Sequence, residues 1–217
     1  MLEETHSKIL ISINNASFNL LQISNLNIVQ GEKYFVTGSS SSGKSTLIRL
    51  LFGDLNPQKG QVFISKKKVH RVLIPKRPEF FETTTGYDNL LISYDINLHK
   101  NLSSFEQQIK EYCLVLNFSY DDLKVKMKNY SDGMKYQIAL IRALLSFPEL
   151  LFIDEIGSSL DSSIKDQIYL LLSKMTREQG VTFVWAEREL ADIQNFNGKR
   201  IHLNQGHIEY MGELCIQ

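Results

Sequence analysis

The stretch Gly38-Ser39-Ser40-Ser41-Ser42-Gly43-Lys44-Ser45 matches the pattern G-x-x-x-x-G-K-[ST], whose backbone N–H groups cradle phosphates at the beginning of a helix. Gly38 permits a tight turn, and Gly43 lets the backbone approach an anion. Lys44 is expected to reach the β- and γ-phosphates of a nucleotide, and the hydroxyl of Ser45 is placed to ligate Mg²⁺. A chance match anywhere in the chain has a probability on the order of one per cent. The stretch therefore predicts binding of ATP or GTP.

The residues on both sides of this stretch supply the context that a phosphate-binding loop requires. Residues 34–37 form a compact apolar run typical of a strand, and residues 45–52 predict a helix that Gly53 ends. Strand, glycine-bounded loop and helix follow one another in the required order. The residues expected to contact the phosphates are Gly38, Ser39, Ser40, Ser41, Ser42, Gly43, Lys44, Ser45 and Thr46.

Apolar runs elsewhere in the chain predict further strands. Residues 150–153 and 181–185 are continuously apolar, as expected of strands that are buried on both faces of a parallel sheet. Ahead of the phosphate loop, β-prone runs at residues 9–13, 16–21 and 23–28 are separated by polar breaks that include an Asn pair. These short runs predict an antiparallel meander.

The second half of the chain adds helices to this pattern. Residues 86–118 read as mostly helical, and Ser131 is the expected N-cap of a helix that begins at Asp132. Residues 200–203 and 207–210 predict a terminal hairpin. We therefore expect an α/β fold: a phosphate-loop nucleotide-hydrolase core with a parallel sheet, an N-terminal antiparallel β-subdomain and a helical subdomain.

Two adjacent carboxylates follow the apolar run at residues 150–153. Asp154 and Glu155 are expected to emerge at the C-terminal end of a buried strand, where open α/β sheets bind their ligands. Asp154 would hold Mg²⁺ together with Ser45, and Glu155 would orient and deprotonate the attacking water. The alternative is an acidic beginning for the next helix, which is common for such a pair alone. The phosphate loop upstream favours the nucleotide site.

Composition limits the class of protein. The 217 residues carry 24 Lys and Arg against 24 Asp and Glu, so the chain lacks the basic excess of a general nucleic-acid binder. The two cysteines, Cys113 and Cys215, lie far apart without metal-ligand spacing, which fits a reducing compartment. We expect no secretory signal, and no run approaches the ~18 apolar residues of a membrane span.

A family resemblance arises from two further motifs. Tyr130-Ser131-Asp132-Gly133-Met134-Lys135 resembles the signature motif of ATP-binding cassette proteins, and Ser158-Ser159-Leu160-Asp161 resembles the D-loop of that family. Together with the phosphate loop and the Asp154-Glu155 pair, these motifs cover most of the chain in the order and spacing of the family. The chain is identified as resembling the ATP-binding subunit of an ABC transporter.

This resemblance implies an architecture and partners. It implies a single nucleotide-binding domain over residues 1–217, with a core at 1–75 and 147–217 and a helical subdomain at 76–146. Two cassettes, identical or paired, would pack head to tail, with Ser131 and Gly133 of one facing the ATP of the other. The resemblance also implies a separate membrane-spanning subunit and a cytoplasmic location, peripheral on the inner face of a membrane.

The sequence departs from the family at several positions. Lys76 occupies the place of the Q-loop glutamine, and Glu187 occupies the place of the switch histidine; we expect both at the catalytic site. The two side chains could compensate by pairing, or both could point away. Leu20 or Phe18 stands where an adenine-stacking aromatic is common.

The sequence leaves open the role of an aromatic cluster and the choice between two functions. An aromatic cluster at residues 78–81 and Tyr87 could receive the membrane subunit or could pack the helical subdomain onto the core. For function, the leading hypothesis is an ATPase subunit of a transporter, and the alternative is an ATP-binding regulatory cassette with slow or no productive hydrolysis. A nucleic-acid-associated cassette is disfavoured by the balanced charge.

Overall fold

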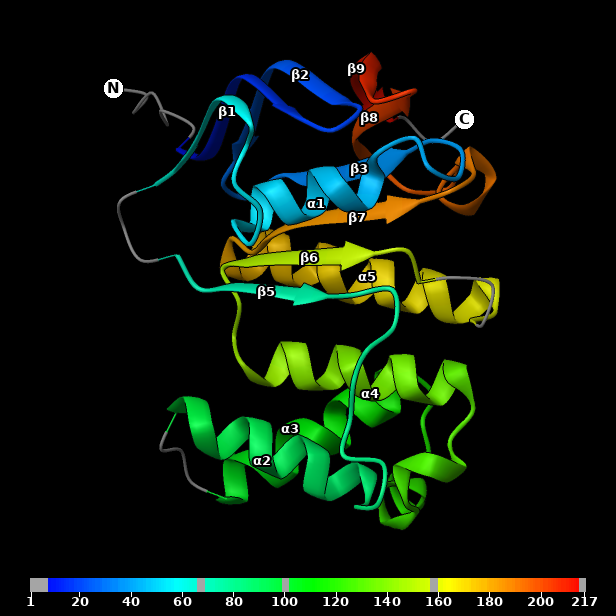
Figure 1. Cartoon of the computed structure of the whole chain (residues 1–217). Coiled ribbons are helices and arrows are strands. Elements are labelled where there is room, and N and C mark those ends of the chain that lie inside the picture. The colour runs from blue at the N-terminus through cyan, green and yellow to red at the C-terminus, as the bar shows by residue number, and fades with distance from the viewer. Residues whose placement is uncertain (1–7, 66–68, 99–101, 157–159, 215–217) are drawn as a thin grey trace, which may run out of the picture.

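The computed structural model of the chain describes residues 8–65, 69–98, 102–156 and 160–214. One sheet of nine strands has the order β4-β1-β2-β9-β8-β3-β7-β6-β5 (Figure 1). In chain order the elements are β1 (Ile9–Phe18), β2 (Leu21–Val29), β3 (Lys33–Thr37), α1 (Lys44–Phe52), β4 (Lys59–Ile64), β5 (Arg71–Ile74), α2 (Gly86–Leu98), α3 (Leu102–Val115), α4 (Asp132–Leu145), β6 (Leu150–Asp154), α5 (Ser162–Gln179), β7 (Thr182–Glu187), β8 (Gly198–Asn204) and β9 (His207–Leu214), with short 3-10 helices at Tyr120–Lys124, Met127–Asn129 and Leu190–Asp192.

The parallel half of the sheet consists of β5, β6, β7, β3 and β8. Successive side chains of these strands point to opposite faces, and in β6 and β7 both faces are buried. Leu150 and Phe152 of β6 pack in the core that contains α1, whereas Leu151 and Ile153 pack in the core that contains α4 and α5. Figure 1 shows α1 and α5 on opposite sides of the strands. The predicted α/β fold with a parallel core sheet is confirmed.

The antiparallel part of the sheet differs from the predicted meander. β1 is one continuous strand, so the expected break at Asn14 and Asn15 is wrong. Asn15 has a φ of 49° just where the pairing of β1 with β4 slips beyond Asn14, which makes it a bulge within the strand. The chain turns instead at Asn19, with a φ of 51°, and Leu20. Asn tolerates this left-handed conformation in bulges as well as in turns, so its presence alone does not tell the two apart.

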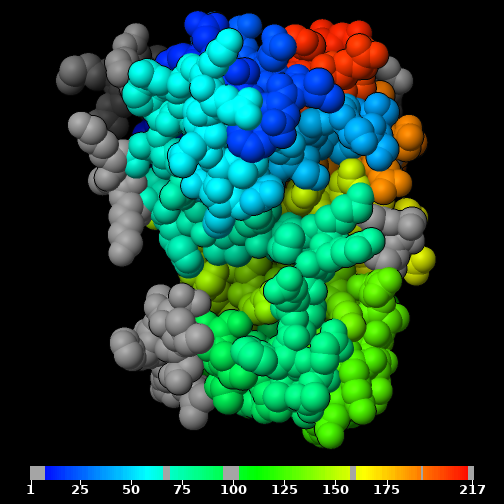
Figure 2. Space-filling view, in the orientation of Figure 1, coloured from blue at the N-terminus to red at the C-terminus, as the bar shows by residue number. Residues whose placement is uncertain are grey.

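Within residues 86–118, where the sequence pattern predicts a mostly helical stretch, the described residues form α2 and α3. Ser131 caps α4, because its Oγ accepts a hydrogen bond from the backbone N–H of Met134 at 3.2 Å. A pocket of ≈ 220 Å³ lies between the edge strand β5 and α4, lined by residues such as Ile74 and Arg142. Figure 2 shows a hollow between the β-rich part and the helical part. Within the described residues, no helix has the length and apolar character that crossing a bilayer requires.

The two halves of the sheet meet at a narrow join. β2 and β9 share one residue pair, Gln22 with His207. The backbone N–H of Gln22 donates to the carbonyl of Gly206 at 2.8 Å, and the N–H of Gly206 donates to the carbonyl of Ser42 at 3.0 Å. The turn between β8 and β9 therefore contacts both β2 and the phosphate loop.

Candidate functional site

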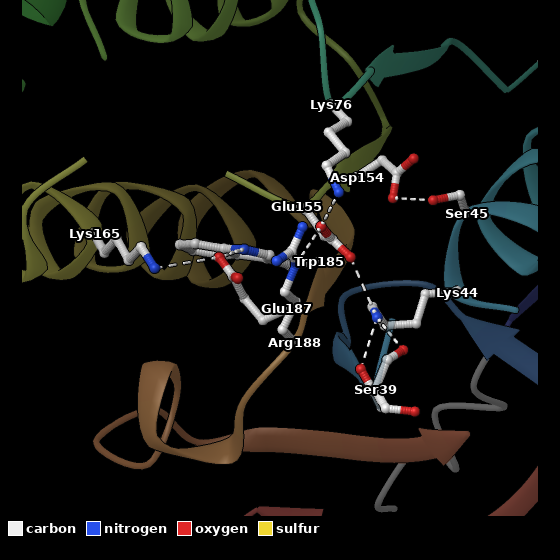
Figure 3. A network of polar contacts seen from close by, with 11 residues as sticks. Ser39, Lys44, Ser45, Lys76, Asp154, Glu155, Lys165, Trp185, Glu187 and Arg188 are labelled. Carbon is white, nitrogen blue, oxygen red and sulfur yellow. Dashed lines mark hydrogen bonds and ion pairs between the residues drawn. The ribbon is translucent and has the colours of Figure 1, made fainter. Parts of the chain in front are cut away.

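Part of the expected site converges at the C-terminal ends of β3, β5 and β6, where Lys44, Ser45, Lys76, Asp154 and Glu155 meet. Lys44 and Ser45 begin α1, directly after the loop that follows β3, while Asp154 and Glu155 lie where β6 ends. Figure 3 shows these side chains together with Lys76, which comes from the segment after β5. Parallel strands bring their carboxyl ends to the same edge of a sheet, which explains why positions so far apart in sequence meet here.

The phosphate loop has the backbone geometry that its glycines predict. Gly38 has a φ of 152°, and a Cβ added there would lie 2.3 Å from the carbonyl oxygen of Leu203. Gly43 has a φ of 107° at the N-cap of α1. The Lys44 ammonium is buried and donates to the carbonyl oxygens of Gly38 at 2.6 Å and Ser39 at 3.0 Å. The loop thus holds a cation and the N-terminus of a helix at one place.

The serines of the loop differ in exposure. Ser39, Ser40 and Ser41 are exposed, whereas Ser42 is buried, and Thr46 is half-buried beside the exposed Ser45. The loop therefore presents Ser39, Ser40 and Ser41 to solvent and keeps Ser42 inside.

Ser45 and Asp154 form a pair of oxygen donors beside the loop. The Ser45 hydroxyl donates to Oδ1 of Asp154 at 2.9 Å. Asp154 takes this position because Phe152 and Asp154 point to the same face of β6, the face that α1 covers. Burial raises the pKa of the Asp154 carboxyl, while the hydrogen bond from Ser45 opposes that shift. Sequence reasoning placed these two residues together, and the structure does the same.

Glu155 is held by three cations. Its Oε1 lies 3.2 Å from the Lys44 ammonium, and its Oε2 lies 2.5 Å from the Lys76 ammonium. The Nε of Arg188 donates to the same Oε2 at 3.1 Å. Burial alone would raise the pKa of Glu155, but the hydrogen bonds from Lys76, Arg188 and Lys44 outweigh it and lower the pKa to about 2. The backbone leaves the strand here with a φ of 50°, which brings the carboxylate beside α1.

Glu187 does not join this cluster. Its carboxylate accepts a hydrogen bond from the indole N–H of Trp185 at 3.1 Å and lies 3.7 Å from the Lys165 ammonium of α5. The side chain is 3% exposed. The two alternatives that the sequence left open, a Lys76–Glu187 pair or two side chains that both point away, are therefore wrong: Lys76 enters the site and binds Glu155, whereas Glu187 turns toward α5 (Figure 3).

Sequence reasoning missed Arg188. Its neighbours in β7 show why it enters the site: Val184 and Ala186 pack with α1, whereas Phe183 and Trp185 pack with α4 and α5. Alternation along the strand directs Glu187 to the α5 side and Arg188 to the side of the phosphate loop. The signal that could have identified Arg188 from the sequence is its position directly after a strand of the parallel sheet.

The signature residues lie elsewhere in the same chain. Ser131 and Gly133 begin α4, which Figure 1 places on the far side of β5 and β6 from α1. Of the expected D-loop, Ser158 and Ser159 lie outside the described residues, and Asp161 is the N-cap of α5. The structure therefore does not bring the signature residues to the phosphate loop of their own chain.

Two smaller expectations are resolved by packing. Leu20 is 77% exposed at the turn between β1 and β2, but it has no aromatic ring. Phe18 is aromatic, but it packs against the core that contains α1. Neither residue therefore presents a free aromatic face on which adenine could stack. In the aromatic cluster, Phe80 lies under the Arg142 guanidinium at 4.6 Å and Tyr87 packs against Phe105. These contacts favour the packing alternative for Phe80 and Tyr87.

Comparisons with known proteins agree with the geometry. The family described as ABC transporter matches residues 21–158. The bacitracin transport ATP-binding protein BcrA of Bacillus licheniformis is 31% identical over 180 residues, which are 78% of this chain and 57% of that protein. The spermidine/putrescine import ATP-binding protein PotA of Thermotoga maritima is 26% identical over 93% of this chain and 58% of its own length. The chain thus spans little more than half the length of these curated relatives.

Among solved structures, the ATP-binding cassette MJ0796, in a dimeric post-hydrolysis state bound to ADP and Pi, superposes with a TM-score of 0.82. The match covers 94% of this chain and 99% of that chain at 22% identity, and it shows a shared fold. Fold, site geometry and the family match over more than half of the sequence agree, so the chain belongs to the ABC transporter family.

Proposed function

We propose that this chain binds ATP, hydrolyses it, and powers transport across a membrane together with a separate membrane-spanning subunit. The observation that carries the proposal is the meeting of Lys44, Glu155 and the Ser45–Asp154 pair at one edge of the sheet. These groups supply a cation for the phosphates, oxygen donors for a metal, and a carboxylate for the attacking water. Positioning and charge stabilisation of this kind are the main contributions to phosphoryl transfer.

Lys44 and the loop would bind the phosphates. The Lys44 ammonium would exchange its bonds to the Gly38 and Ser39 carbonyls for phosphate oxygens, while N–H groups at the beginning of α1 face the same anion. Ser45 and Asp154 fit Mg²⁺, because they present two hard oxygen donors 2.9 Å apart, and Mg²⁺ usually takes one or two protein oxygens together with phosphates. When bound, Mg²⁺ neutralises charge on the phosphate oxygens.

Glu155 would act on water. Its carboxylate stands beside Lys44, so a water near the γ-phosphate would lie within reach of it. The carboxylate would orient this water and accept its proton as the water attacks phosphorus. The cleaved phosphate and ADP then leave the loop.

The assembly follows from where the signature residues lie. Ser131 and Gly133 are remote from the phosphate loop of their own chain, so a second cassette packed head to tail would supply them to the nucleotide. We treat residues 1–217 as one nucleotide-binding domain with a helical subdomain at 76–146. Its place would be peripheral, on the cytoplasmic face of a membrane. The names of BcrA and PotA, transport ATP-binding proteins, support this assignment.

The test is phosphate release by the purified full chain with Mg-ATP, measured alone and with the membrane-spanning subunit of the proposed transporter. The matched variant is Glu155→Gln, which keeps the shape of the side chain but is a far weaker proton acceptor. We expect the variant to bind ATP, to lose most of its hydrolysis and to accumulate as an ATP-bound dimer. Equal rates for the parent and the variant would exclude Glu155 as the base.

One observation favours a second candidate, a regulatory cassette with slow hydrolysis. Three cations hold Glu155 and lower its pKa to about 2, which weakens it as a proton acceptor. In that case the chain would bind ATP and dimerise, yet its phosphate release would equal that of Glu155→Gln both alone and with the membrane subunit.

A further inference from the structure

The two oxygens of the Glu155 carboxylate have different partners. Among the residues that the structure describes, Oε1 is paired with the Lys44 ammonium, at 3.2 Å, whereas Oε2 is shared by Lys76 at 2.5 Å and Arg188 at 3.1 Å. The Glu155 side chain is 6% exposed, while the side chains of Lys76 and Arg188 are 44% and 54% exposed. Two cations thus reach inward from the rim of the site to one oxygen of a buried anion (Figure 3).

A bound nucleotide would affect the three cations around Glu155 differently. Lys44 is the ammonium of the phosphate loop, so bound phosphates compete with Oε1 for it. Lys76 and Arg188 come from the ends of β5 and β7, outside the phosphate loop. When Lys44 turns to phosphate oxygens, Oε1 loses its partner while Oε2 keeps both of its own. One oxygen becomes available to water, and the other anchors the side chain.

Arg188 is suited to this anchoring. It donates through Nε, a planar N–H with a fixed direction, whereas Lys76 offers a rotatable ammonium. Glu155 sits at a backbone φ of 50°, past the end of β6, and its N–H still donates to the carbonyl of Ala186 in β7 at 3.1 Å. The backbone is therefore held here, and the direction of the carboxylate depends on its ion-pair partners. A misplacement of about 1 Å in a reacting group can cost about a hundredfold in rate, so a directional hold on the carboxylate matters for hydrolysis.

We propose that Arg188, together with Lys76, is a positioning residue for ATP hydrolysis: the two cations hold Oε2 of Glu155 so that Oε1 is presented to the attacking water once Lys44 has moved to the phosphates. This inference rests on the proposed function. It also gives a role to Lys76, which stands in the place of the Q-loop glutamine usual in the family.

The experiment compares steady-state hydrolysis and ADP binding for the full chain and the variants Arg188→Met, Arg188→Lys and Lys76→Met. Arg177→Met is the control, since Arg177 is an exposed arginine on α5 that pairs with its neighbour Glu178. We expect Arg188→Met to lower kcat about tenfold, with KM for ATP and affinity for ADP within about twofold of the parent. Arg188→Lys should recover part of kcat, because it restores the charge without the directed N–H.

A combination with Glu155→Gln isolates the mechanism. If Arg188 acts through Glu155, then Arg188→Met should cause no further loss of single-turnover rate in the Glu155→Gln background. An unchanged or raised kcat for Arg188→Met would overturn the inference, as would a change confined to KM. The same assay separates this from failure of the proposed function, in which the parent would be no faster than Glu155→Gln.

Discussion

Replacing Glu187 by histidine, the residue usual in the family at this position, should destabilise the chain without activating it. The Glu187 side chain is buried and points to the α5 side of β7, away from the phosphate loop. A histidine placed there would meet Trp185 and Lys165 rather than a nucleotide. Its imidazole would offer no negative charge to the Lys165 ammonium at 3.7 Å.

The size of the loss follows from these two contacts. A hydrogen bond to a charged acceptor contributes ~1.5–3 kcal/mol, and removing one partner of a buried ion pair costs ~3–5 kcal/mol. The Lys165–Glu187 distance of 3.7 Å is long for an ion pair, which places the expected loss near ~3 kcal/mol. For a chain of this size that corresponds to a fall in Tm of roughly 6–12 °C.

Thermal unfolding and urea titration of Glu187→His would measure this loss, with phosphate release followed on the same samples. Glu187→Gln is the control, because it keeps an oxygen acceptor for the Trp185 indole and removes only the charge. Combining Glu187→His with Lys76→Gln should give additive changes within ~0.5 kcal/mol, since Lys76 binds Glu155 instead. An unchanged Tm together with faster hydrolysis would refute the reasoning, because residue 187 would then face the nucleotide.

The phosphate loop and the signature helix give further predictions. Lys44→Ala should weaken ATP binding by at least ~2 kcal/mol in calorimetry, because it removes the charge expected to face the phosphates; equal affinity would contradict the site. Ser131→Ala should lower the free energy of unfolding by ~1 kcal/mol in urea titration, because the N–H of Met134 loses its acceptor; no loss would show that the cap is weak. Gly38→Ala should abolish ATP binding and reduce Tm, because its Cβ would meet the Leu203 carbonyl at 2.3 Å; a parent-like Tm would show that the turn can relax.

Sequence reasoning succeeded where a single local rule decides the outcome. The N-cap at Ser131 and the left-handed glycine after α1, Gly53, depend on chemistry within a few residues. The Ser45–Asp154 pair was predictable because the phosphate loop and the end of β6 have fixed places in a parallel sheet. The helix ends required no knowledge of distant packing, and the Ser45–Asp154 pair required only the general topology of a parallel sheet.

Other features could not be read from the sequence for physical reasons. β7 is buried on both faces, so its composition has no period-2 pattern that would tell which face Glu187 or Arg188 takes. The three cations that pair with Glu155 come from three separate segments of the chain. The sequence offers many possible ion pairs, and only the folded structure shows which charged side chains lie close enough to form them. Asn15 shows that a local feature can also be ambiguous in the sequence. The left-handed conformation that Asn favours occurs both in bulges and in turns, so the residue type does not tell which of the two forms.

The narrow join between β2 and β9 has a consequence for how the chain opens. With one residue pair across it, the sheet has its weakest backbone connection there, so β1, β2 and β4 form a natural unit for local unfolding. The carbonyls of Gly206 and Ser42 tie that join to the phosphate loop through two backbone hydrogen bonds. An anion that orders the loop should therefore slow amide hydrogen exchange at Gln22 and along β2. Nucleotide occupancy would then be reported by protection in a part of the sheet that holds none of the charged groups around Glu155.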